Sequence, residues 1–275
     1  MPVPQPLALD NATVDSHVHL HDITDLQGQL DSALQAFKQS VKGHGAGWPF
    51  VGIMILTEPQ SCSTFSLLQQ RLRRESTAPT TPWKLFATAE TISLRATHDQ
   101  GDTLLLLSGQ QIVTRENIEV LSLLAPPDVP DGLSLAETVQ KVLTIGGLPV
   151  LPWGVGKWLG KRGAIVSKFL AETVAQPLFL GDNGSRPAFW RSIPQFEQAQ
   201  KAGIPTLRGS DPLRCSYRRR GPGSFGNLLT CHIDMQHPGK SLREALTDRH
   251  FPPIEFGELE KPWHFLKDQI TLRIS

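Results

Sequence analysis

Short apolar runs of strand length recur along the chain, and most are followed by a polar or glycine-rich loop and then by a segment with helical spacing. The first run spans residues 12–18 and precedes a helical segment at 25–41. The apolar residues of that segment recur every three or four positions, at Leu26, Leu30, Leu34 and Phe37. Such alternation is typical of βα units around a parallel sheet. The pattern therefore predicts an α/β fold.

Further strand and helix segments follow in the same alternation. We predict strands at 50–56, 148–151, 178–180 and 206–207, and helices at 65–74, 134–143, 164–173 and 193–202. The middle differs, because residues 84–94 and 103–113 flank a short turn and are expected to form antiparallel strands. Too few regular units remain for an ideal eightfold barrel. We expect a distorted, TIM-like (βα)7-8 barrel.

Length, charge and cysteine content narrow the class of protein. At 275 residues the chain has the size of an α/β barrel, so we expect one domain over residues 1–275. A net charge of +1 argues against nucleic acid as a partner, and the basic cluster at 214–220 is a weak signal in so neutral a chain. Only three cysteines occur, and no apolar run approaches the ~20 residues that span a bilayer. We therefore expect a cytoplasmic protein without membrane contact.

The clearest candidate for chemistry is the segment VDSHVHLH at residues 14–21. Histidines two positions apart in a strand point to the same face, so His17 and His19 can reach one metal ion. Asp15, placed on the same face by the same spacing, could orient a histidine ring or bind the ion itself. The alternative is a surface loop that happens to carry histidines. Packing does not explain a pair of histidines directly after a buried strand, so we favour a role of the pair in an active site.

This segment resembles the opening motif of two families of metal-dependent hydrolases, the amidohydrolases and the PHP (polymerase and histidinol phosphatase) proteins. Later segments favour the PHP type and follow its order: LSGQQIV at 107–113, EVLSL at 119–123, GGLPVLPW at 146–153 and RGSDPL at 208–213. The resemblance spans residues 12–213. It implies a βα barrel that holds divalent metal ions at its C-terminal face and hydrolyses phosphoester, amide or lactone bonds.

Four positions depart from the PHP pattern. Gln111 stands where the family has a bridging glutamate, and histidines of the family are replaced at Glu119, Trp153 and Leu213. These replacements exclude a complete site of three metal ions.

The candidate metal ligands that remain are His17, His19, Asp211 and Glu58. Two histidines with one or two carboxylates can hold a single Zn²⁺, Mn²⁺ or Fe²⁺ and leave a position open for water. Asp211 could also accept a proton from that water. The alternative for Asp211 and Glu58, each followed by proline, is ordinary turn chemistry. We expect one divalent ion.

Candidates for substrate binding lie in two loops after predicted strands. Asp182 and Asn183 follow the run at 178–180, and Arg186 could bind a carboxylate or phosphate with both arms of its guanidinium group. Lys157 lies in a glycine-rich turn that could approach an anion. The alternative for these loops is simple turn formation and packing.

Together, these features predict a metal-dependent hydrolase of a small anionic substrate, most simply a phosphoesterase that uses metal-activated water. One alternative is a PHP-like protein that has lost catalysis and binds a ligand or a partner, which the missing ligands favour. Another is a mononuclear amidohydrolase acting on an amide or a lactone.

Overall fold

The computed structural model of the chain describes residues 9–20, 23–42, 50–74, 81–172, 177–213, 219–248 and 253–274. Its strands are β1 (Leu9–Val18), β2 (Val51–Leu56), β3 (Trp83–Ala87), β4 (Ser93–His98), β5 (Thr103–Val113), β6 (Glu119–Leu123), β7 (Leu148–Pro152), β8 (Phe179–Asn183), β9 (Thr206–Gly209), β10 (Gly226–Ile233) and β11 (Ile254–Phe256). Its α-helices are α1 (Leu26–Lys42), α2 (Thr64–Arg74), α3 (Leu135–Thr144), α4 (Lys161–Glu172), α5 (Pro194–Lys201), α6 (Pro238–Thr247) and α7 (Pro262–Ile274).

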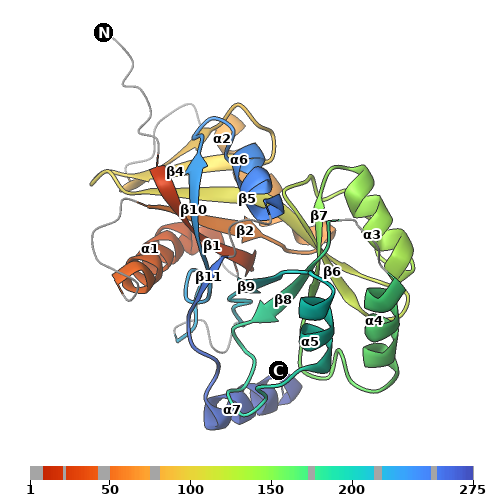
Figure 1. Ribbon diagram of the computed structural model, residues 1–275. Coiled ribbons are helices and arrows are strands. Elements are labelled where there is room, and N and C mark those ends of the chain that lie inside the picture. Colours follow the sequence, from red (N-terminus) through yellow and green to blue (C-terminus); the bar gives the residue numbers. More distant parts are fainter. Residues whose placement is uncertain are drawn as a thin grey trace.

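The sheet curls into a nearly closed barrel. Its strand order is β11-β10-β1-β2-β5-β6-β7-β8-β9, and helices flank it on the outside (Figure 1). The hydroxyl of Ser16 on β1 donates to the carbonyl of Arg208 on β9 over 2.9 Å, so the last barrel strand returns to the first. The prediction of a distorted α/β barrel is confirmed.

The distortion lies at β6. All neighbouring pairs from β1 to β9 on the barrel path are parallel except those of β6, which runs antiparallel to both β5 and β7. Only residues 114–118 connect β5 to β6, which is too short for a helical crossover, so the two strands form a hairpin. The predicted antiparallel region is also confirmed, since β3, β4 and β5 pair in antiparallel order.

Two apolar clusters show which side of each strand faces the barrel interior. One cluster combines alternate residues of the barrel strands with α6, among them Val14, Ile53, Ile55, Leu105, Leu107, Leu123, Val150, Phe179 and Leu207. A second cluster packs the other side of β1, β2 and β5 against α1 and α2, through residues such as Val18, Met54, Leu56, Leu106 and Phe37. Strands β1, β2 and β5 are therefore buried on both sides, as is usual for parallel strands.

A β-bulge interrupts β1 just before the histidines. Asp15 is in register with Met54 and Val18 with Leu56, so β1 advances three residues while β2 advances two. The extra residue reverses the alternation, because Val14 lies in the interior cluster and Val18 in the outer one. Bulges often redirect side chains beside active sites. This one turns His17 toward the barrel interior and leaves Asp15 on the outer side, which corrects the prediction that they share a face.

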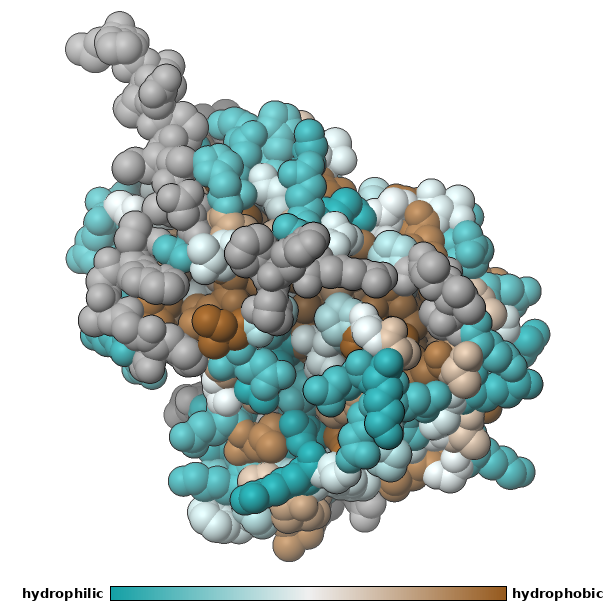
Figure 2. All heavy atoms as spheres, viewed as in Figure 1, coloured by the Kyte–Doolittle hydropathy of each residue, from teal (hydrophilic) through white to brown (hydrophobic). Residues whose placement is uncertain are grey.

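The C-terminal elements complete the sheet and close one side of the barrel rim. β10 pairs antiparallel with β1 and carries β11 on its far edge, a pairing that the sequence pattern did not predict. Beyond β11, Glu260 is bonded through its backbone to Arg186 and Ala188, which fastens α7 beside the loop after β8. Figure 2 shows hydrophilic residues over much of one face, with brown apolar residues between them. Within the described ranges, no helix is long and apolar enough to cross a membrane.

Candidate metal centre

Three predicted ligands, far apart in sequence, converge at the C-terminal end of the barrel strands. The Nε2 atoms of His17 and His19 lie 3.1 Å apart. The Oδ1 atom of Asp211, just after β9, lies 3.6 Å from His17 Nε2 and 3.5 Å from His19 Nε2. The three side chains form a group that could hold a metal ion.

The spacing of these atoms fits a small divalent ion. Two ligands at 2.0–2.1 Å from a tetrahedral Zn²⁺ lie about 3.3 Å apart. The three observed spacings, 3.1, 3.5 and 3.6 Å, bracket that value. Two imidazoles and one carboxylate are also the donor types that such ions prefer. The residues therefore fit a metal ion.

Close backbone packing between β1 and β9 holds the three ligands together. The backbone N–H of Asp211 donates to the carbonyl of His17 over 2.8 Å. A Cβ atom at Gly209 would lie 2.3 Å from Cβ of His17, so only glycine allows this approach. Asp211 itself has φ +42°, a left-handed conformation that aspartate tolerates better than most residues.

Asp15 ties the same two strands together from the outer side of the sheet. Its Oδ1 accepts a hydrogen bond from the backbone N–H of Ser210, and its Oδ2 accepts one from Gly223, each over 2.8 Å. Burial raises the pKa of Asp15 to about 6, although these hydrogen bonds act in the opposite direction. Asp15 therefore positions the segment that carries Asp211 through its backbone bonds.

The environment of Asp211 favours its charged form. Burial acts to raise the pKa of this carboxyl group, but the charges of His17, His19 and Lys157 and a hydrogen bond from Asn183 outweigh burial and hold the pKa below its usual value. The amide of Asn183 donates to Oδ2 of Asp211. The carboxylate is therefore ionised at neutral pH, as a metal ligand must be.

The structure places Glu58 near the histidines but outside their group. Its Oε1 accepts a hydrogen bond from the backbone N–H of Leu20 over 3.0 Å, and burial raises the pKa of its carboxyl group. Among the described residues, the three-ligand group contains no further histidine, cysteine or carboxylate. Glu58 thus holds the backbone at Leu20, the residue after His19.

Asp182 near the end of β8 and Arg186 just after this strand bind each other. Arg186 donates from Nε and Nη2 to the two carboxylate oxygens of Asp182, over 2.6 and 2.7 Å. Arg208 adds a second positive charge, with its Nε 3.6 Å from Asp182 Oδ2. Asp182 and Arg186 are 4% and 7% exposed. The guanidinium group of Arg186 binds a carboxylate with two of its nitrogens, but this carboxylate is that of Asp182 in the same chain.

Lys157 and Glu119 form an ion pair at the same end of the barrel. Glu119 opens β6, which runs against its neighbours, so its first residue lies level with the last residues of the parallel strands. Lys157 is partly exposed and acts electrostatically on Asp211. Two candidates for substrate binding therefore act on Asp211: Lys157 through its charge and Asn183 through a hydrogen bond.

Gln111 is a neighbour of the site that the sequence identified only as a departure from the PHP pattern. Its Oε1 lies 3.2 Å from Nε2 of His17. The feature of the sequence that could have identified Gln111 is its position near the end of β5. It lies two residues after Gly109 and therefore on the same side of the strand.

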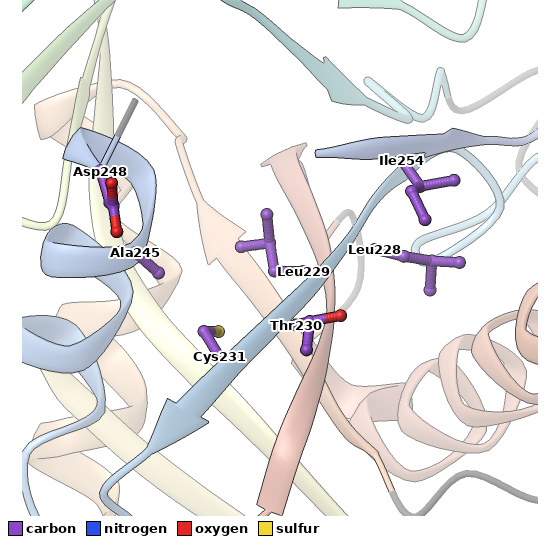
Figure 3. A pocket seen from close by; sticks show the side chains of 7 residues that line it. All are labelled: Leu228, Leu229, Thr230, Cys231, Ala245, Asp248 and Ile254. Carbon is purple, nitrogen blue, oxygen red and sulfur yellow. The ribbon is translucent and has the colours of Figure 1, made fainter. Parts of the chain in front are cut away.

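A pocket elsewhere on the molecule is lined by none of these residues. It has a volume of about 370 Å³ and lies between β10, β11 and α6 (Figure 3). Its lining is mostly apolar: Leu228, Leu229, Thr230, Cys231, Ala245, Asp248 and Ile254. The pocket contributes nothing to the metal group.

Comparison with known proteins gives similarity at the level of structure. No protein-family model and no curated protein matches the chain. PsfC from Pseudomonas syringae is 12% identical, with a TM-score of 0.51 over 96% of this chain and 99% of that chain. The lesion-specific endonuclease PfuEndoQ from Pyrococcus furiosus is 13% identical, with a TM-score of 0.52 over 89% of this chain and 57% of that chain.

A third similar structure is Endonuclease Q in complex with a 27-mer duplex that has an abasic lesion at the active site. It is 13% identical, with a TM-score of 0.50 over 86% of this chain and 56% of that chain. This chain therefore spans little more than half of each endonuclease chain. These likenesses show the fold, a distorted α/β barrel that this chain shares with Endonuclease Q.

The prediction from net charge that nucleic acid is not a partner is wrong. Two of the similar structures are endonucleases, and one holds a DNA duplex. Net charge sums over the whole chain, whereas phosphate contacts depend on where individual lysines and arginines lie. Of the basic cluster at 214–220, Arg219 and Arg220 are described and lie beside Glu260, and residues 214–218 fall outside the described ranges.

Proposed function

We propose that the chain is a metal-dependent hydrolase that cleaves phosphodiester bonds of nucleic acid with a single divalent ion, Zn²⁺, Mn²⁺ or Fe²⁺. The observation that carries the proposal is the convergence of His17, His19 and Asp211, with ligand atoms 3.1 to 3.6 Å apart at the end of the barrel where such folds place active sites. The endonuclease neighbours support nucleic acid as the substrate class.

Each residue of the site has a distinct task in this proposal. A divalent ion, when bound, supplies positive charge that polarises a phosphoryl oxygen and makes water a better nucleophile. His17 and His19 hold the ion as neutral donors. Asp211 presents Oδ1 to the same centre and, being ionised, can accept the proton that the attacking water loses.

Lys157 binds the substrate anion in this proposal. Its side chain is 36% exposed, and its charge acts to lower the pKa of Asp211, which supports a role beside the reacting centre. Glu119 holds the long side chain in place, which lowers the entropy lost on binding a phosphate oxygen. Lys157 is the better candidate than Arg186, because its side chain is partly exposed whereas Arg186 is buried and binds both oxygens of Asp182.

The test begins with metal content and activity of the whole chain. Chelator-free protein is measured by mass spectrometry for bound metal, then assayed with Zn²⁺, Mn²⁺ or Fe²⁺ on single-stranded and duplex oligonucleotides, with and without an abasic lesion. His17→Ala and Asp211→Asn should lower cleavage by at least about 100-fold. His237→Ala serves as the matched control, because His237 is exposed and its ring nitrogen contacts Asp234.

Each other result argues for a different function. Binding of oligonucleotides without cleavage would replace the hydrolase by a binding protein. Cleavage of aryl phosphates alone would make it a small-substrate phosphoesterase, and cleavage of aryl esters or lactones alone an amidohydrolase-type enzyme. Absence of bound metal, or full activity in His17→Ala, would overturn the metal mechanism.

A further inference from the structure

We infer that the side-chain amide oxygen of Gln111 is a fourth protein ligand of the metal ion, so that two nitrogens and two oxygens hold it and a fifth position stays open for water. This inference rests on the proposed metal-dependent function. The observation behind it is the crowding around one atom: Nε2 of His17 lies 3.1 Å from His19 Nε2, 3.2 Å from Gln111 Oε1 and 3.6 Å from Asp211 Oδ1.

Hydrogen bonding alone cannot satisfy so many neighbours of one imidazole nitrogen. A neutral ring nitrogen carries either one hydrogen or one lone pair, directed in the ring plane, and so serves one partner well. A cation bound between these four nitrogen and oxygen atoms would accept a lone pair from each of them. The 3.2 Å between His17 Nε2 and Gln111 Oε1 is close to the ~3.3 Å between ligands of a tetrahedral ion.

The backbone of β5 aims Gln111 at this centre. Leu105 and Leu107 belong to the interior cluster, so Gly109 and Gln111 point to the same side by alternation. β5 pairs with β2 up to Ser108 and then with β6, where Gln111 is in register with Leu121. The residue is therefore held within the sheet rather than on a loop.

Gln110, the preceding residue of β5, is a glutamine whose side chain has a purely structural role. Gln110 is 1% exposed, accepts a hydrogen bond from the backbone N–H of Val129 over 3.1 Å, and donates to the Val129 carbonyl over 2.6 Å. Both ends of its amide are satisfied by one backbone segment. Gln111 instead directs its oxygen at a metal-binding nitrogen.

A neutral fourth ligand has a consequence for the charge of the site. With Asp211 as the single anionic ligand, a divalent ion keeps one net positive charge, whereas a carboxylate at residue 111 would cancel it. The amide therefore holds the ion less tightly but leaves more attraction for a phosphate anion. This balance suits a site whose substrate is an anion.

The test compares Gln111→Leu and Gln111→Glu with the unaltered chain, and uses Gln140→Leu on the exposed side of α3 as the control. Zn²⁺ affinity is measured by competition with a chromophoric chelator, and the visible absorption of bound Co²⁺ reports the ligand geometry. We expect Gln111→Leu to weaken Zn²⁺ binding by at least about tenfold and to change the position or intensity of the Co²⁺ bands, because the ion loses a protein ligand. Gln111→Glu should bind Zn²⁺ more tightly, and Gln140→Leu should change neither measurement.

The readouts separate this inference from the proposed function. Unchanged Zn²⁺ affinity in Gln111→Leu, or weaker binding with unchanged Co²⁺ bands, would show that Gln111 acts outside the ligand set and would overturn the inference alone. Gln111→Glu retains the size of the side chain, so it decides the question if the leucine variant does not fold. A chain that binds no metal at all would overturn both, and one that binds metal as expected but cleaves nothing would overturn only the function.

Discussion

The side-chain amide of Asn183 donates to Oδ2 of Asp211, which leaves Oδ1 of the same carboxylate facing His17 and His19. Asn183 is itself fixed, because its Oδ1 accepts a hydrogen bond from the backbone N–H of Ser185 over 2.7 Å. The amide therefore determines which carboxylate oxygen is available to a metal ion, although it is not itself one of the three ligands.

Asn183→Ala should weaken metal binding without removing a ligand. Loss of the hydrogen bond frees Asp211 to rotate and removes one of the interactions that hold its pKa low. Loss of such an orienting partner typically costs 10- to 100-fold in metal affinity. Chelator competition with Zn²⁺ measures this effect, and an affinity equal to that of the unaltered chain would contradict it.

Gly209→Ala should separate β1 from β9. The added methyl group would lie 2.3 Å from Cβ and 2.6 Å from the backbone nitrogen of His17, so one strand must move. Overpacking of this kind costs about 1–3 kcal/mol of folding free energy. Denaturant unfolding and Zn²⁺ titration should both show a loss, whereas a variant with normal stability and normal affinity would mean that the two strands tolerate separation.

Lys157→Met should impair substrate binding and leave metal binding intact. A charge-assisted hydrogen bond to a phosphate oxygen is worth about 1.5–3 kcal/mol, so kcat/KM should fall by roughly 10- to 100-fold, mainly through KM. Lys84→Met is the matched control, because Lys84 pairs with Asp99 on an exposed hairpin. A fall in kcat with unchanged KM would contradict the binding role.

Glu260→Gln should destabilise the protein in a pH-dependent manner. Burial acts to raise the pKa of Glu260, but Arg220 and Arg219 outweigh burial and hold it below its usual value. Its contribution to stability is therefore fully present above about pH 4.5 and is lost as the pH falls through the lower pKa of the folded state.

The melting temperatures of the two proteins should accordingly differ most near neutral pH. Removing one partner of a buried pair costs about 3 kcal/mol, and the difference should shrink below pH 4.5, where protonated glutamate resembles glutamine. Glu172→Gln, in an exposed pair with Lys168, should show little effect at any pH. A constant difference between pH 3 and pH 7 would disprove the role of the Glu260 charge.

The local pattern of the sequence was sufficient for most elements up to β9 and for part of the candidate site, whereas β10, α6, β11 and α7 were not predicted. Periodicity placed the strands and helices of the barrel, because burial on one side or both sides imposes a repeat on the chain itself. The pairing of His17 with His19 followed from their spacing in a strand, whereas their link to Asp211 followed from the resemblance to the PHP proteins.

Only the tertiary structure decided which side chains meet. The bulge at 15–18 separates Asp15 from the histidines, and no sequence pattern shows an extra residue that exists only relative to β2. Asp182 binds Arg186, four residues further along the chain, instead of a substrate. Gln111 reaches His17 because β5 and β1, distant in sequence, converge in the barrel. A buried charged or amide group needs a hydrogen-bond partner to compensate for the loss of water. Which partner is within reach depends on the tertiary packing and not on the local sequence.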